Sequence, residues 1–117
     1  MTDFFNGQIG FQTDDVFVQP GLNVTSSATH LEGFGMVGII MPPTLTSTSM
    51  AFTGSQDNKN FYDLYNTAGE LLVISIAPNR IVLFSPGDFV GINFIKLILN
   101  NNEAAIRSFK VISRSFQ

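Results

Sequence analysis

The sequence predicts an all-β fold, an antiparallel jelly-roll-like β-sandwich of about eight strands. Short segments of alternating apolar and polar residues recur about every ten residues, with turn residues between them, which is typical of sandwiches and barrels. No segment shows the apolar spacing of an amphipathic helix. At 117 residues, the chain is long enough to bury one core without disulfides.

The N-terminal residues form the first element of the prediction. Residues 1–13 are rich in Phe and Gly and show no clear period, so we expect an N-terminal arm ahead of one sandwich domain over residues 14–117. Phe4, Phe5 and Phe11 are its large apolar side chains and are the candidate partner-binding residues. The alternative is that this segment is simply the first strand of the sheet, with its Phe side chains in the core.

The remaining elements are strands separated by turn residues. Pro20 and Gly21 suit a turn, because Pro presets φ and Gly supplies the positive φ that follows. The continuous apolar run at residues 34–41 predicts a strand buried on both faces, whereas the expected segment at residues 25–30 is a polar loop. The candidate strands cover residues 16–19, 22–25, 34–41, 45–53, 61–65, 71–76, 81–84, 93–99 and 106–116.

The composition is that of a folded protein with few charges. Apolar residues make up 44% of the chain and charged residues 13%, about half of the usual share of roughly 25%. Such hydrophobicity excludes a disordered chain, and the absence of Cys excludes disulfides and thiolate metal sites. We expect a surface that is partly covered by a partner.

Charge and hydropathy exclude two classes of partner. Residues 1–58 hold five acidic side chains and no Lys or Arg, whereas residues 59–117 hold six basic and four acidic ones, which is not the basic footprint of a nucleic-acid-binding protein. Scattered surface charge and head-to-tail contact between copies both explain the asymmetry. The first residues lack the features of a signal peptide, and the apolar run at residues 34–43 is too short to span a bilayer. We therefore expect synthesis in the cytoplasm and no membrane partner.

Two motifs could suggest a cofactor or a metal. Gly33, Gly35 and Gly38 have the spacing of a dinucleotide-binding loop, but Pro42 and Pro43 follow where that loop needs a helix, so we expect glycines in a tightly packed strand. Residues 57–63 offer oxygen atoms at alternate positions. The EF-hand spacing fails there, because Tyr62 and Ala68 stand where Gly and Glu are required, which leaves a solvated tip or a looser calcium site.

No catalytic constellation is apparent, and we expect no enzyme, no cofactor and no metal. His30 is the single histidine and lies in a polar segment, so we expect it to face solvent. Asp14 and Asp15 are adjacent, and adjacent side chains of a strand point to opposite faces, which argues against an acid pair.

The segment at residues 50–65 predicts a strand, a polar tip and a second strand that ends in aromatic residues. Its Gly-Ser-x-Asp start resembles a hairpin of discoidin-like and related jelly-roll sandwiches. Tyr62, Tyr65 and the amides at residues 56–60 would suit a sugar platform. A carbohydrate-binding module of a phage tail or cell-surface protein is therefore the alternative function.

Over residues 22–99 the sequence resembles small tailed-bacteriophage virion proteins of the head cement or decoration type. The segments that carry the resemblance are Val37-Gly-Ile-Ile-Met-Pro, Met50-Ala-Phe-Thr-Gly-Ser-Gln-Asp, Asn60-Phe-Tyr-Asp-Leu-Tyr, Arg80-Ile-Val-Leu and Phe89-Val-Gly-Ile-Asn-Phe-Ile-Lys-Leu. Asn58 stands where that family has a Gly.

The resemblance implies a structural protein on the capsid surface of the virion. It would bind the major capsid protein from outside and stabilise the head. Self-association as a homo-dimer or homo-trimer is implied as well, because such proteins sit on local symmetry axes.

Overall fold

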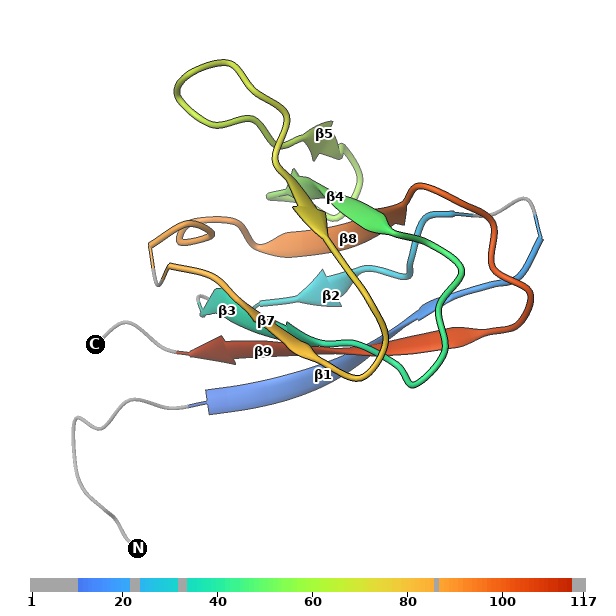
Figure 1. Cartoon of the computed structure of the whole chain (residues 1–117). Helices are drawn as coiled ribbons and strands as arrows, with labels where there is room; N and C mark the ends of the chain where they lie inside the picture. Colours follow the sequence, from blue (N-terminus) through green and yellow to red (C-terminus); the bar gives the residue numbers. More distant parts are fainter. Residues whose placement is uncertain (1–10, 22–23, 32–33, 86, 115–117) are drawn as a thin grey trace, which may run out of the picture.

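The computed structural model describes residues 11–21, 24–31, 34–85 and 87–114, and within them it contains strands and no helix (Figure 1). Two antiparallel sheets lie face to face around one core. The strands are β1 (Phe11–Val18), β2 (Thr29–His30), β3 (Gly35–Ile40), β4 (Ser49–Ser55), β5 (Tyr62–Asp63), β6 (Val73–Ser75), β7 (Ile81–Leu83), β8 (Phe94–Leu99) and β9 (Arg107–Arg114).

The strand order is that of a jelly roll, which confirms the predicted fold class. One sheet, sheet A, has the order β1-β9-β3-β7, and the other, sheet B, has the order β2-β8-β4-β5 with β6 also paired to β4. β5 and β6 lie on the same edge of β4, because β8 pairs along the opposite edge. They therefore act as one interrupted strand, and with them counted together each sheet has four strands.

The best predictions of strand position concern β8 and β9. Along β8, Ile95, Leu97 and Leu99 are buried while the residues between them are half-buried. Along β9, Phe109 and Val111 point into the core as the alternation predicts. The strand predicted at residues 34–41 is confirmed as β3, between β9 and β7, but its two faces are not equally buried, because Ile39 faces the core whereas Ile40 is half-buried on the outer face.

Other strand predictions were wrong in position or burial. The expected polar loop at residues 25–30 contains β2, which pairs with the start of β8. The strand expected from residue 45 begins at Ser49, since Thr46 and Ser47 use their amides to bind a side chain instead of a neighbouring strand. The segment at residues 71–76, expected to be buried, exposes 49% of Val73, because Val73 lies beside Ala51 on the face of sheet B that points away from the core.

Sheet A begins earlier than the sequence predicts. β1 starts at Phe11 and pairs with β9 without interruption as far as Val18. Residues 11–13, assigned from the sequence to the arm, thus belong to the ladder, where pairing with β9 satisfies their backbone groups. Phe4 and Phe5 lie outside the described residues.

Three Phe rings form the aromatic part of the core. Phe52 of β4 and Phe89 of the turn before β8 are fully buried, and Phe84 packs against both. The three ring pairs are edge-to-face, with centroids 5.0–5.7 Å apart. This cluster packs Phe84 and Phe89 against sheet B.

At the other end of the sandwich, the carboxylate of Glu103 is fully buried. It accepts hydrogen bonds from the backbone amides of Thr46 and Ser47, each at 2.8 Å, and from the Ser47 hydroxyl at 2.7 Å. Arg107 Nε donates a further hydrogen bond to Glu103 Oε1 at 2.8 Å. The Glu103 side chain therefore joins the β3–β4 connection to the β8–β9 connection, 56 residues apart in sequence.

These contacts decide the protonation state of Glu103. Burial by itself raises the pKa of this carboxyl, but the hydrogen bonds from Arg107, from the Ser47 hydroxyl and from the two amides outweigh burial and lower the pKa from 4.5 to about 2. Because the folded-state pKa is the lower one, the stabilisation is complete above pH 5. It is lost as the pH falls through 4.5 towards 2.

We expect Glu103→Gln to lower the free energy of unfolding by about 2–4 kcal/mol at pH 7, because buried donors lose their partner and Arg107 loses its counter-charge. Urea unfolding measures this change. Glu70→Gln is the matched control, since Glu70 is exposed and accepts one side-chain hydrogen bond from Asn66. The difference between wild type and Glu103→Gln should shrink as the pH approaches 2. An equal stability of both proteins at pH 7 would contradict the anchoring role.

Candidate functional site

The tip of the β4–β5 hairpin is organised by one carboxylate. Asp57 Oδ1 accepts hydrogen bonds from the Ser55 hydroxyl and from the amides of Lys59 and Asn60, each at 2.9 Å. Asp57 Oδ2 accepts a hydrogen bond from Asn60 Nδ2 at 2.8 Å. An Asp that bonds the backbone two and three residues ahead of it forms a local turn of this kind. The tip thus holds its own shape although it is exposed to solvent.

The same hydrogen bonds keep Asp57 ionised. Those from the Asn60 and Lys59 amides, followed by those from the Asn60 and Ser55 side chains, hold the pKa of Asp57 far below its usual range. The tip therefore carries a fixed negative charge. Asn58, which replaces the Gly of the resembled family, has φ of 60°. Asn is among the residues other than Gly that best tolerate this conformation, so the replacement preserves a tight tip.

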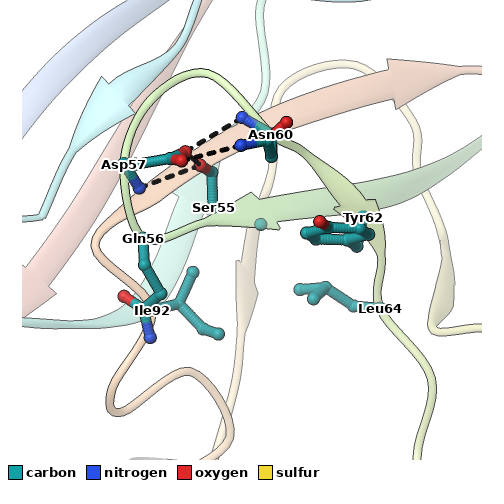
Figure 2. A pocket seen from close by; sticks show the side chains of 8 residues that line it. Ser55, Gln56, Asp57, Asn60, Tyr62, Leu64 and Ile92 are labelled. Carbon is teal, nitrogen blue, oxygen red and sulfur yellow. Dashed lines mark hydrogen bonds between the residues drawn. The ribbon is translucent and has the colours of Figure 1, made fainter.

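A pocket of about 260 Å³ lies beside the tip (Figure 2). Tyr62 and Leu64 line one side of it, and Gln56 and Ile92 line the other, with Asp57 and Asn60 of the tip above. Its lining residues are Gly54, Ser55, Gln56, Asp57, Asn60, Tyr62, Leu64 and Ile92. We call this site the hairpin pocket.

The floor of the hairpin pocket needs a glycine. A Cβ atom placed on Gly54 would lie 2.9 Å from Ile92 Cγ2, which forces Ile92 to shift, and 3.1 Å from Leu64 Cδ2, which is a tight contact. Ile92 comes from the turn before β8, and Leu64 follows β5. The absence of a side chain at Gly54 allows these two apolar groups to approach each other across the hairpin.

The polar groups of the hairpin pocket are held by their own hydrogen bonds. Gln56 Nε2 donates to the Gly91 carbonyl at 2.7 Å, and Asn60 Nδ2 donates to Asp57. Within the part of the chain that the structure describes, the side-chain oxygens of Gln56 and Asn60 receive no hydrogen bond. The Tyr62 side chain is 69% exposed. The pocket therefore combines an apolar floor with an open aromatic ring, and two amide side chains with free acceptor oxygens stand at its rim.

A second surface lies on the outer side of sheet A. In the strand register, Gly38 lies between Leu83 of β7 and Ile112 of β9, and Ile40 lies opposite Ile81. The side chains of Ile40, Ile81, Leu83 and Ile112 therefore share one face. A Cβ atom on Gly38 would lie 3.4 Å from Leu83 Cδ2 and 3.6 Å from Ile112 Cδ1, which places both side chains over the glycine. Leu83 is 77% exposed and Ile81 is 54% exposed. We call Ile40, Ile81, Leu83 and Ile112 the β7 face.

Several residues singled out in the sequence have structural roles. Asp14 accepts a hydrogen bond from Thr29 at 3.1 Å, while Asp15 on the opposite face pairs with Lys110 at 2.8 Å, so they do not form an acid pair. His30 is exposed, as expected, but it belongs to β2 and stacks on Phe94 with ring centroids 4.4 Å apart.

The other motifs do not form sites. Gly35 and Gly38 lie inside β3, and no helix follows them in the described residues, which contradicts a dinucleotide loop. Across the described ranges, no three His, Cys, Asp or Glu side chains are placed to hold a metal ion. None of the described elements is a helix long and apolar enough to cross a membrane.

The structure describes little of the three candidate partner-binding residues. Phe11 is described only through its backbone in β1, and Phe4 and Phe5 are outside the described residues.

Sequence reasoning found part of the hairpin pocket. It placed Gln56 and Tyr62 at one rim, and the structure brings them together there. It missed Ile92, because that side chain comes from the turn before β8 and is distant from the hairpin in sequence, and it did not assign Leu64 to the site. Tyr65, expected to share the platform, is 60% exposed but does not line the pocket.

Comparison with known proteins shows the fold. No protein-family model and no curated protein matches the chain. A solved structure described as SPBc2 prophage-derived protein YomS is similar over 97% of this chain and 100% of its own, with a TM-score of 0.58 and 12% sequence identity. The chain therefore shares its all-β architecture with a prophage-derived protein.

Proposed function

We propose that this chain is a structural virion protein of a tailed phage, a capsid cement or decoration protein that binds the outer surface of the head and has no enzymatic role. The observation that carries the proposal is the end-to-end similarity in fold to a prophage-derived protein. Jelly rolls are common in viral capsid proteins, where they form and cover shells. The sequence resemblance to the cement and decoration type points in the same direction.

The β7 face supplies a surface for the shell. β7 is an edge strand, so its outer edge leaves backbone donors and acceptors available next to exposed Ile81 and Leu83. Apolar side chains beside a free strand edge suit a partner that adds a strand and buries the side chains. We assign this face to the major capsid protein, because a shell presents the same partner surface many times. A modest interface per copy is then sufficient.

The arm is the second part of the proposed attachment. Phe4 and Phe5 precede β1, and we propose that they bind a neighbouring shell subunit. We also propose that copies associate as a dimer or a trimer on the head. Sedimentation of the isolated chain at its monomer mass of 12.8 kDa would show that this association needs the head.

Mass spectrometry of purified phage particles tests the proposed function. We expect the chain to be present in a constant ratio to the major capsid protein, because decoration follows the symmetry of the head. Gentle removal of the chain should lower the temperature at which the heads open. Its absence from purified particles would refute a virion role.

We expect deletion of residues 1–10 to weaken binding to undecorated heads while the sandwich stays folded. The cut ends before Phe11, so all pairs between β1 and β9 remain. Co-sedimentation with heads measures binding, and thermal unfolding checks the fold. Full occupancy by the truncated protein would refute the role of the arm.

We expect Leu83→Lys to weaken binding to heads about tenfold or more, because it removes a buried leucine from the interface and adds a charge that must be desolvated. Folding should be unaffected, since the Leu83 side chain is 77% exposed. Val73→Lys is the matched control, because Val73 is an exposed apolar residue of the other sheet. Equal binding by both variants would show that the interface does not include the β7 face.

A further inference from the structure

We propose that the hairpin pocket is a binding site for one uncharged sugar ring. This inference goes beyond attachment to the shell and does not depend on it, since the hairpin pocket belongs to sheet B and the β7 face belongs to sheet A. Four features of the pocket carry the proposal: an open aromatic ring, free acceptor oxygens, a fixed negative charge and a small volume.

The aromatic ring is Tyr62, which stands beside the pocket on the side of Leu64 (Figure 2). A pyranose presents C–H groups on one face, and such apolar faces pack on aromatic rings. With 69% of its surface exposed, Tyr62 is free to receive a ligand. Its side chain has two χ angles, so little conformational entropy is lost when it becomes fixed.

The free acceptors match hydroxyl groups. Gln56 and Asn60 each use their amide nitrogen within the protein, on the Gly91 carbonyl and on Asp57 Oδ2 respectively. Their carbonyl oxygens stay available at the rim of the pocket, and the hydrogen bonds of the nitrogens hold both side chains before a ligand arrives, which lowers the entropy cost of binding. A ligand with several O–H donors satisfies these oxygens, whereas a ligand with acceptors alone does not.

Charge selects against acidic sugars. Asp57 is ionised because the tip amides stabilise its charge, and it lines the same pocket. Lys59 is the basic residue of the tip but does not line the pocket, and the Lys96 ammonium lies over the Phe61 ring, 4.3 Å from its centroid. Nothing in the lining therefore offsets the repulsion that a carboxylate or phosphate on the ligand would meet from Asp57.

The volume sets the size of the ligand. Sites for drug-sized molecules usually measure about 300–1,000 Å³, and the hairpin pocket is smaller at about 260 Å³. One ring fits, and further sugars of a chain would extend into solvent. Binding by a single copy is consequently weak, and many copies on one particle would bind a polysaccharide far more tightly.

NMR titration of the ¹⁵N-labelled full chain tests the proposal. The probes are the methyl glycosides of glucose, galactose and mannose, together with N-acetylglucosamine, and N-acetylneuraminic acid is the acidic comparison. We expect at least one neutral probe to shift the amide signals of Gln56, Asn60, Tyr62 and Ile92. N-acetylneuraminic acid should leave these signals in place.

Matched variants locate the site. Tyr62→Ala should weaken binding at least tenfold, and Tyr62→Phe should retain it if the ring face is the main contact. Tyr65→Ala is the control, because Tyr65 is similarly exposed and lies outside the pocket. Unchanged thermal unfolding of all three variants would show that they fold normally.

Three results would overturn the proposal. The first is that no neutral probe shifts the pocket signals, and the second is that Tyr62→Ala binds as wild type does. The third is that N-acetylneuraminic acid binds as well as the neutral sugars. Because the assay uses the isolated chain without heads, its failure leaves the virion proposal standing, and absence from virions leaves the sugar site standing.

Discussion

The buried Glu103 carboxylate is the interaction on which the ordering of one end of the sandwich depends. It brings together connections that have no strand pairing of their own, and its backbone carbonyl also accepts a hydrogen bond from the Gly21 amide. Three loops thus meet at one residue. An ion pair that is buried in this way is costly to disrupt, because each donor would then remain in the interior without a partner.

At the other end of the sandwich, around the hairpin pocket, the order has a different source. β4 and β8 run from the Glu103 end to the hairpin pocket, so the pocket rests on strands whose far ends are fixed. There the order comes from short-range hydrogen bonds around Asp57, within six residues of chain. A rigid scaffold that carries an exposed, locally determined loop is a common arrangement for binding sites.

Alternation made much of the fold predictable. In residues 94–99 and 107–114 the alternation of side chains predicts which face is buried, since each strand has one face on the core. β2 has two residues and no period of its own, so its existence depends on pairing with β8. Glu103 follows polar residues and gives no sign of burial in the sequence, because Thr46 and Ser47, which supply most of its hydrogen bonds, are more than fifty residues away. Tyr62 was predictable as a site residue because it belongs to the hairpin itself. Ile92 was not, because it reaches the pocket from the turn before β8.

The position of β9 has a consequence for how the chain folds during synthesis. β9 is made after the other eight described strands, yet it lies between β1 and β3 inside sheet A. Both of those strands keep an unpaired edge until residues 107–114 have been translated. Sheet A therefore cannot form completely before residues 107–114 have been made, and its pairings are distant in sequence, which makes its folding slow. During that interval the edges of β1 and β3 are open to pairing with another nascent chain.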